Sequence, residues 1–229
     1  MPGQLVFPFG VRPALARDAF VVAPCNEQAY RFIERWPDWE ARAAAIYGPK
    51  GCGKTHLAQI WREASGAAEI LLGPDPDFTS LEQMAASLPP DAAILLEDVN
   101  ANPSRERDLF LMAMFERPQA RLLLTALEAP SRWPVLLHDL RSRLDSLLAF
   151  PIWAPDEALL SAIVRKHFAD RQLSVPDKVV ARIVTHVERT PEAIAAFIAR
   201  ADLKALSEQR AIGERLVMDL IEAEENAAG

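Results

Sequence analysis

A glycine-rich loop near the end of the first quarter of the chain has residue types and spacing that suit phosphate binding. The pattern G-x-x-x-x-G-K-[ST] is matched by eight consecutive residues, Gly48, Pro49, Lys50, Gly51, Cys52, Gly53, Lys54 and Thr55. An apolar run precedes them and a helical pattern follows, which is the setting that the motif requires. In such a loop, backbone N–H groups surround a phosphate, the lysine contacts the terminal phosphates, and the threonine hydroxyl ligates Mg²⁺. The loop predicts binding of ADP or ATP with Mg²⁺, with His56 of the next helical turn at the nucleotide; a loop kept only for folding is the alternative.

Two acidic residues follow a second apolar run and are expected to serve the bound metal. Five apolar residues, 92–96, lead directly into Glu97 and Asp98. We expect Glu97, Asp98 and Thr55 to organise Mg²⁺, and Asp98 to act on the attacking water. The usual order is Asp followed by Glu, so the reversed order puts fast hydrolysis in doubt, because a shorter side chain at the second position reaches the water less well. The alternative is two acids that merely end a strand at the surface.

Two further polar positions lie after later apolar runs. Thr125 ends the run 121–125, where its hydroxyl could sense the γ-phosphate or could be an ordinary strand-end hydroxyl. The segment 139–144 carries Arg141 and Arg143. An arginine held there could reach a nucleotide on a neighbouring subunit and stabilise its transferred phosphate, so Arg143 is a candidate catalytic residue. A surface salt bridge explains these arginines equally well.

The elements that must position these groups alternate along the chain up to about residue 154. Apolar runs predict strands at 43–47, 69–72, 92–97, 121–125 and 147–152, with helical patterns at 26–36, 54–63, 80–88 and 104–116. This alternation predicts a parallel sheet with both faces covered. After Pro155 only helical patterns remain, near 156–171, 176–187, 191–208 and 213–224. Thr190 can cap the third of these and Pro191 suits its first position, so Arg189 lies at a helix entrance.

Composition and charge exclude several classes of protein. The chain has 229 residues and a net charge of −7, which argues against a general polyanion binder and against direct sequence-specific DNA binding. Two cysteines, Cys25 and Cys52, cannot form a disulfide framework, and no apolar stretch approaches the ~20 residues of a membrane helix. We therefore expect a cytoplasmic protein with no membrane segment. The four histidines lack ligand spacing, so we expect no zinc site.

The order of these parts resembles the AAA+ ATPases of the DnaA family over about residues 18 to 225. The segment 20–26 resembles the family's adenine-site segment, which adds Val21 and Val22 to the expected nucleotide site. Arg143 lies in a Ser-Arg-Leu context that resembles the family's box VII arginine, and Arg189 resembles its sensor 2 arginine. The resemblance implies an α/β P-loop AAA+ domain with a parallel sheet at 18–154, followed by a small all-α lid at 155–229.

The first 17 residues are expected to form a flexible arm. Residues 4–9 resemble a sliding-clamp-binding motif, in which Gln4, Leu5, Phe7, Pro8 and Phe9 would enter a hydrophobic groove of the clamp. A frayed terminus with some apolar residues is the alternative.

The resemblance also implies a biological role. Because the sequence ends after the lid, we expect neither the DNA-binding domain nor the amino-terminal domain of a DnaA initiator. The family resemblance then implies a regulator of replication initiation that binds adenine nucleotide and the DNA polymerase sliding clamp. It would stimulate hydrolysis of ATP on the DnaA initiator, with Arg143 acting in trans, and could form homo-oligomers. An autonomous AAA+ ATPase such as a helicase loader is one alternative, and a nucleotide-gated adaptor without hydrolytic output is another.

Overall fold

The structure of the chain is a computed structural model, which describes residues 17–72 and 75–228. Its sheet has five parallel strands in the order β2-β3-β4-β1-β5. The strands are β1 (Ala43–Tyr47), β2 (Ala68–Leu71), β3 (Ala93–Glu97), β4 (Arg121–Ala126) and β5 (Leu148–Pro151). All five predicted strands are therefore present, and their parallel pairing is confirmed. The expected clamp-binding residues Gln4, Leu5, Phe7, Pro8 and Phe9 lie outside the described residues.

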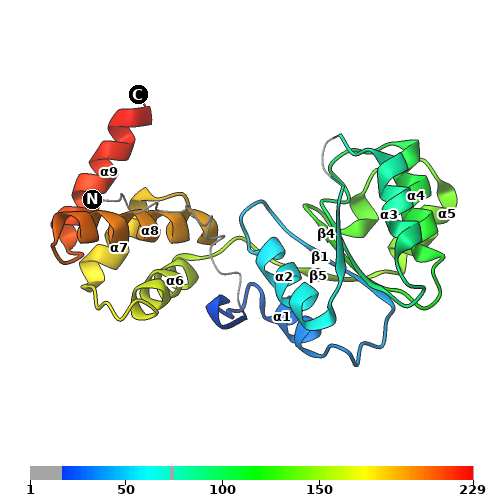
Figure 1. Cartoon of the computed structure of the whole chain (residues 1–229), viewed down its shortest axis with the longest axis horizontal. Coiled ribbons are helices and arrows are strands. Elements are labelled where there is room, and N and C mark those ends of the chain that lie inside the picture. The colour runs from blue at the N-terminus through cyan, green and yellow to red at the C-terminus, as the bar shows by residue number, and fades with distance from the viewer. Residues whose placement is uncertain (1–16, 73–74, 229) are drawn as a thin grey trace, which may run out of the picture.

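Helices cover both faces of this sheet (Figure 1). One face is covered by α1 (Glu27–Glu34) and α2 (Lys54–Ser65), and the other by α3 (Phe78–Ser87), α4 (Arg105–Phe115) and α5 (His138–Asp145). Alternate strand residues supply the two cores: Ala44 and Leu95 pack on the α1 and α2 side, while Ala45 and Leu96 pack on the other. This alternation is what a strand buried on both faces requires.

One helix of this layer was not expected from the sequence. In α5, which carries Arg141 and Arg143, the buried residues are Leu140 and Leu144, and four of the other residues are charged. Two leucines spaced by four residues are too short a stripe to identify a helix by periodicity. Two short 3-10 helices, Arg17–Ala19 and Pro130–Arg132, were also not expected.

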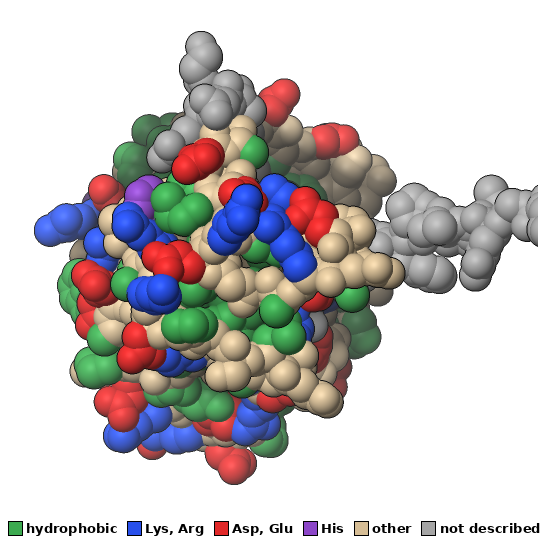
Figure 2. Space-filling model, turned by 90° about the vertical axis from the view of Figure 1, so that its left-hand side faces the viewer, with side chains coloured by type: hydrophobic (Ala, Val, Ile, Leu, Met, Phe, Trp, Pro, Cys, Tyr) green, Lys and Arg blue, Asp and Glu red, His purple; other side chains and the backbone are tan. Residues whose placement is uncertain are grey.

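The carboxyl-terminal part is helical, as predicted, and has its own core. It consists of α6 (Glu157–Ala169), α7 (Asp177–His186), α8 (Pro191–Glu208) and α9 (Glu214–Ala228), packed around side chains such as Phe168, Ile183 and Phe197. The predicted cap of α8 is confirmed, because the Thr190 hydroxyl oxygen accepts a hydrogen bond from the Ala193 amide at 3.1 Å. On the side of the molecule that this part forms, basic and acidic side chains are interspersed with apolar ones (Figure 2). Within the described residues, no helix combines the length and apolar character needed to cross a membrane.

Candidate functional site

The glycine-rich loop lies where β1 ends and α2 begins, as predicted. The Lys54 ammonium is buried and donates to the carbonyl oxygens of Gly48 and Pro49 at 2.8 and 2.9 Å. The Gly48 amide in turn donates to the Ala126 carbonyl oxygen at the end of β4, at 3.1 Å. The lysine is thus held inside the loop at the carboxyl edge of the sheet, whereas Pro49 and Lys50 are exposed. Both acceptors of the Lys54 ammonium are neutral carbonyl oxygens. Negatively charged phosphate oxygens would bind the ammonium more strongly than these carbonyl oxygens do.

Two glycines of the loop are required by close contacts. Gly51 has a φ of +71°, and a Cβ there would lie 2.3 Å from the Cγ2 atom of Thr190. A Cβ on Gly48 would lie 2.0 Å from the carbonyl oxygen of Ile152. Neither position accepts a side chain without movement of its neighbours. Through Gly51, the loop is in contact with the residue that begins α8.

The acidic pair divides into a buried and an exposed residue. Glu97 ends β3 and is 8% exposed, and its Oε1 atom has no hydrogen-bond partner. Burial raises the pKa of Glu97 to about 7, aided by the nearby charges of Glu69 and Asp98, while Thr55 acts in the opposite direction. A carboxylate with an unpartnered oxygen next to the loop threonine fits an Mg²⁺ site. No group of three or more His, Cys, Asp or Glu within the described ranges could hold a metal by itself.

Asp98 is exposed and takes part in a tight turn. Its φ of +55° lies in the left-handed region, which Asp tolerates better than most residues. The Asp98 amide donates to the Thr125 hydroxyl oxygen at 3.1 Å, and the Val99 amide donates to the Thr125 carbonyl oxygen at 3.1 Å. Thr125 is itself buried, on β4, the strand between β1 and β3. Its visible role is to hold the acidic turn in place.

Glu69 is a member of this site that the sequence analysis missed. It lies on β2 and interacts with the Glu97 side chain. Gln59 of α2 donates to one of its oxygens at 3.0 Å, and Arg62 lies 3.4 Å from the other. The sequence did contain a signal for Glu69, which is a charged residue within a short predicted strand. A charged side chain on a strand that a helix covers needs a polar partner, so Glu69 could have been expected to interact with another polar group.

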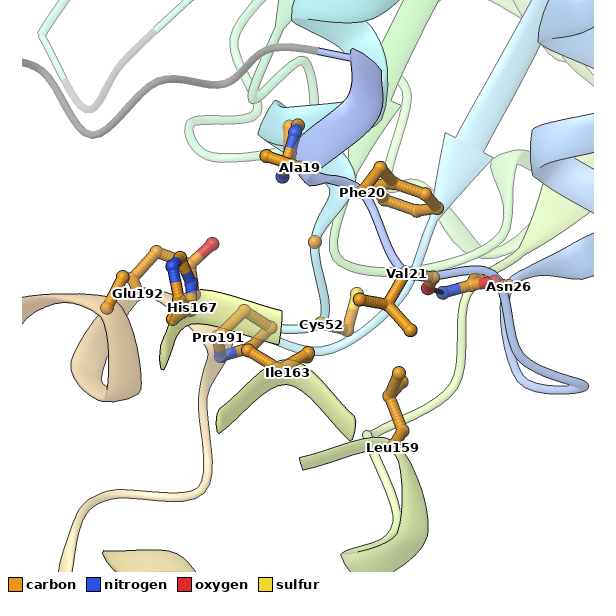
Figure 3. A pocket seen from close by; sticks show the side chains of 13 residues that line it. Ala19, Phe20, Val21, Asn26, Cys52, Leu159, Ile163, His167, Pro191 and Glu192 are labelled. Atoms are coloured by element: carbon orange, nitrogen blue, oxygen red, sulfur yellow. Dashed lines mark hydrogen bonds between the residues drawn. The ribbon is translucent and has the colours of Figure 1, made fainter. Parts of the chain in front are cut away.

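A cavity of about 610 Å³, part of it open to solvent, adjoins the loop (Figure 3). It lies between the segment before α1, the start of α2, and the helices α6 and α8. Its lining includes Val21, Cys52, Gly53 and His56, all of which the sequence placed at the nucleotide. Val22 is 44% exposed and is not among the lining residues. Val21 is partly buried and packs against the core of the helical part, so of the two valines it is Val21 that reaches the cavity.

Aromatic contacts and one buried amide shape the wall formed by the segment before α1. Phe20 stacks on Tyr30 with ring centroids 5.5 Å apart and meets the His56 ring edge-on at 5.1 Å. The Asn26 side chain is buried, accepts from the Ala23 amide at 2.9 Å and donates to the Val21 carbonyl oxygen at 3.0 Å. These two bonds fix the turn that presents Phe20 and Val21. The sequence analysis did not identify Phe20 or Asn26 individually.

The opposite wall comes from α6 and from the first turn of α8. Leu159, Ile163 and His167 lie on one face of α6, spaced by four residues, and Glu192 follows from α8 (Figure 3). Burial lowers the pKa of His167, which favours the neutral imidazole. His167 continues the apolar stripe of α6 at helical spacing, and this pattern could have identified it as a lining residue from the sequence. Arg189, in contrast, is exposed and is not among the lining residues.

Arg143 lies at the other edge of the sheet. It is 41% exposed, forms an ion pair with Glu116 at 4.0 Å, and borders a hollow at Ala43, the first residue of β1. Arg141 serves a different purpose, because its guanidinium donates to the carbonyl oxygens of Pro130 and Ser131 and so holds α5 in place. The structure therefore does not bring Arg143 to the chain's own phosphate loop.

These features define the class of protein. A parallel sheet in this strand order, a phosphate loop after its first strand and a helical unit at its carboxyl end together form an AAA+ fold. Within that class the chain is similar to DnaA. It is 24% identical over 220 residues to the chromosomal replication initiator protein DnaA of Nautilia profundicola, covering 88% of this chain and 50% of that protein. No model of a known protein family matches the chain.

Solved structures show the same likeness. Domain III of DnaA from Thermotoga maritima superposes with a TM-score of 0.71 at 18% identity, covering 92% of this chain and 97% of that one. A DnaA structure with AMPPCP and single-stranded DNA superposes with a TM-score of 0.68 at 20% identity, covering 84% of this chain and 66% of that one. The chain spans about half the length of the curated DnaA relatives that it matches. The likeness therefore concerns the AAA+ part of DnaA.

Proposed function

We propose that the chain binds ADP or ATP in the cavity beside the loop. The phosphates would lie against residues 48–55, and the base would lie between Phe20 or Val21 and the apolar face of α6. An apolar cavity with a few polar groups and a helix start at one end is the usual form of a nucleotide site. A DnaA structure of the same fold contains AMPPCP, which supports this assignment. Arg189 and Thr125 would respond to the terminal phosphate, and His56 would contact the nucleotide.

Mg²⁺ would be held by Thr55 and Glu97, with Asp98 beside them. The unpartnered Oε1 atom of Glu97 is the observation that favours this site. When bound, the ion would neutralise charge on the phosphates. The residues themselves would orient the ligand: Lys54, now bound to the Gly48 carbonyl oxygen, would hold one side of the phosphate chain, and Thr125 holds the turn that carries Asp98.

We further propose that the protein regulates replication initiation by stimulating hydrolysis of ATP bound to the DnaA initiator, in the manner of the regulator Hda. The observation that carries this proposal is the position of Arg143, which is exposed at the edge of the sheet opposite the chain's own loop. A guanidinium placed there is remote from the chain's own loop, so any nucleotide on which it acts would be held by another chain. Arginine residues supplied in trans are worth roughly 10³–10⁵-fold in phosphoryl transfer.

The proposal includes a sliding clamp as the second partner. Residues Gln4 to Phe9 would bind it, with the chain acting in the cytoplasm either as a monomer or as a homo-oligomer. Clamp docking would concentrate the protein where replication has just begun, which raises its effective concentration at the initiator.

An autonomous ATPase, such as a helicase loader, is the second candidate. It is favoured by the complete loop and by Glu97, which lies buried next to Thr55. This candidate predicts steady hydrolysis by the isolated protein and no dependence on an initiator. The exposed Asp98 in place of a longer glutamate argues for the regulator.

The deciding experiment measures loss of γ-phosphate from ATP preloaded on the DnaA initiator, with DNA-loaded clamp, with and without this protein. We expect clamp-dependent acceleration that falls by about 100-fold or more in Arg143→Ala, while the variant's own nucleotide affinity is unchanged. Arg165→Ala, which removes an exposed arginine of the helical part, is the matched control. Full stimulation by Arg143→Ala would contradict the role of that arginine, and no stimulation by the parent protein would contradict the proposed function.

A further inference from the structure

The hollow beside Arg143 contains a second arginine. It lies at the amino ends of β1, β4 and β5, where Arg42, Arg143 and Ser146 are among its lining residues. Apolar residues, including Phe115, Leu122 and Leu147, also line it. Its volume is about 640 Å³, part of it open to solvent. Two guanidinium groups thus border one partly apolar hollow.

Arg42 is held in place by its surroundings. Its Nη1 atom donates to the Arg117 carbonyl oxygen at 2.9 Å, and its own carbonyl oxygen accepts from the Leu122 amide at 2.8 Å. That side-chain bond uses one of the five N–H donors of a guanidinium. Arg117 is itself anchored, because it donates to the carbonyl oxygens of Ala85 and Leu88 at 3.1 and 3.0 Å. The orientation of Arg42 is therefore set before any ligand arrives.

Arg143 is also fixed at its backbone and weakly paired at its side chain. Ser146 donates to the Arg143 carbonyl oxygen at 2.9 Å, which supports the end of α5. The ion pair with Glu116 has a length of 4.0 Å and involves two exposed side chains, so it contributes little. Arg42 and Arg117 donate to backbone carbonyl oxygens rather than to carboxylates, and Glu116 is paired with Arg143 alone. The residues that line the hollow include two arginines and no carboxylate, in a chain with a net charge of −7.

We propose that this hollow is an anion site that receives the phosphate chain of a nucleotide bound to a second protein, with Arg42 as a phosphate-binding residue beside Arg143. The proposal rests on the function proposed above. Guanidinium groups bind phosphate oxygens through paired N–H donors, and apolar walls lower the local dielectric constant and strengthen the attraction. Because Arg42 is preorganised, little conformational entropy is lost when it binds.

The test compares Arg42→Ala and Arg42→Lys with Arg35→Ala, which removes an exposed arginine of the α1 end. We expect Arg42→Ala to lower the stimulated hydrolysis of initiator-bound ATP by about tenfold, because one charge-assisted hydrogen-bond pair is lost. Arg42→Lys should recover only part of this loss, since a lysine is a point charge without the paired donors. Arg35→Ala should behave as the parent protein, and all variants should keep the parent's own ADP affinity.

A second readout separates phosphate binding from ordinary protein contact. The parent protein should bind the ATP-loaded initiator more tightly than the ADP-loaded initiator, and Arg42→Ala should reduce that preference. Equal weakening of both complexes would overturn the assignment of phosphate as the ligand and indicate a carboxylate of the partner instead. Full stimulation by Arg42→Ala, with stimulation lost in Arg143→Ala, would overturn the role of Arg42 and leave the proposed function standing. Absence of stimulation by the parent protein would overturn both the role of Arg42 and the proposed function.

Discussion

The two edges of the sheet present their charged groups in opposite ways. At the carboxyl edge, Lys54, Glu97 and Thr125 are buried, and Lys54 and Thr125 are hydrogen-bonded to the backbone of the loop and the acidic turn. At the amino edge, Arg42 and Arg143 are exposed and border an open hollow. Groups that act on the chain's own ligand can be enclosed by its fold, whereas groups that act on another chain must remain at the surface.

Elementary electrostatics explains why the edges differ in residue type. At the carboxyl edge, the start of α2 contributes backbone N–H groups and positive potential toward a phosphate, so one lysine suffices. The amino edge has no such contribution from α2, so side-chain charge has to supply the attraction. Three variants at the carboxyl edge and in its cavity test whether the two edges act independently.

The largest effect is expected from Lys54→Ala. Loss of the buried ammonium should weaken ATP and ADP binding by about 100-fold, because a charge-assisted contact with the terminal phosphates is removed. Fluorescent-nucleotide titration measures this, with Lys178→Ala on α7 as the exposed control. If the edges are independent, Lys54→Ala retains stimulation of the initiator whenever its fold is retained. Unchanged nucleotide affinity in Lys54→Ala would show that the loop is not the phosphate site.

A smaller effect is expected from Glu97→Gln, and it depends on pH. The pKa of Glu97 in the fold is about 7, above its ordinary 4.5, so the folded chain holds a proton there that the unfolded chain has lost. The free energy of unfolding of the parent therefore falls as pH rises from 4.5 to 7. Glutamine cannot ionise, so the variant should be more stable than the parent by about 3 kcal/mol at pH 8, and the two should be equally stable near pH 4.

Chemical denaturation at both pH values measures this difference, and the exposed Glu106→Gln on α4 is the control for loss of a surface charge. The same Glu97→Gln variant should require more Mg²⁺ for tight ATP binding. A stability gain that is equal at pH 4 and pH 8 would show that ionisation of Glu97 is not its cause.

The smallest effect is expected from Asn26→Ala. The variant loses two hydrogen bonds that hold the turn carrying Phe20 and Val21, so the cavity wall should loosen. We expect nucleotide affinity to fall by about fivefold, or ~1 kcal/mol, without a change in the stimulation measured at saturating protein. Gln28→Ala, on the exposed side of α1, is the control. An affinity loss of the same size in Gln28→Ala would mean that the turn is not the cause.

The carboxyl edge was easier to predict from the sequence than its surroundings. The loop, the acidic pair and Thr125 each belong to a short run of adjacent residues next to an apolar strand. Residues that are adjacent in the sequence stay adjacent in the structure, so these patterns can be recognised before the fold is known. Glu69 and Asn26 act through partners on other elements, and a sequence does not show which elements will pack together. Helix α5 was missed because Leu140 and Leu144 are its only buried residues. Val22 was predicted with Val21 from one motif, although only Val21 packs against the helical part and lines the cavity.

The contact between Gly51 and Thr190 has a kinetic consequence. Thr190 caps α8 and lies against the loop that would hold the phosphates, so we expect α8 to move when a bound nucleotide leaves. The residence time of ADP should then depend on how often the helical part opens, more than on the strength of the phosphate contacts. The packing of α8 against the loop would then set the rate of nucleotide exchange, and with it the time that the protein spends in each nucleotide state.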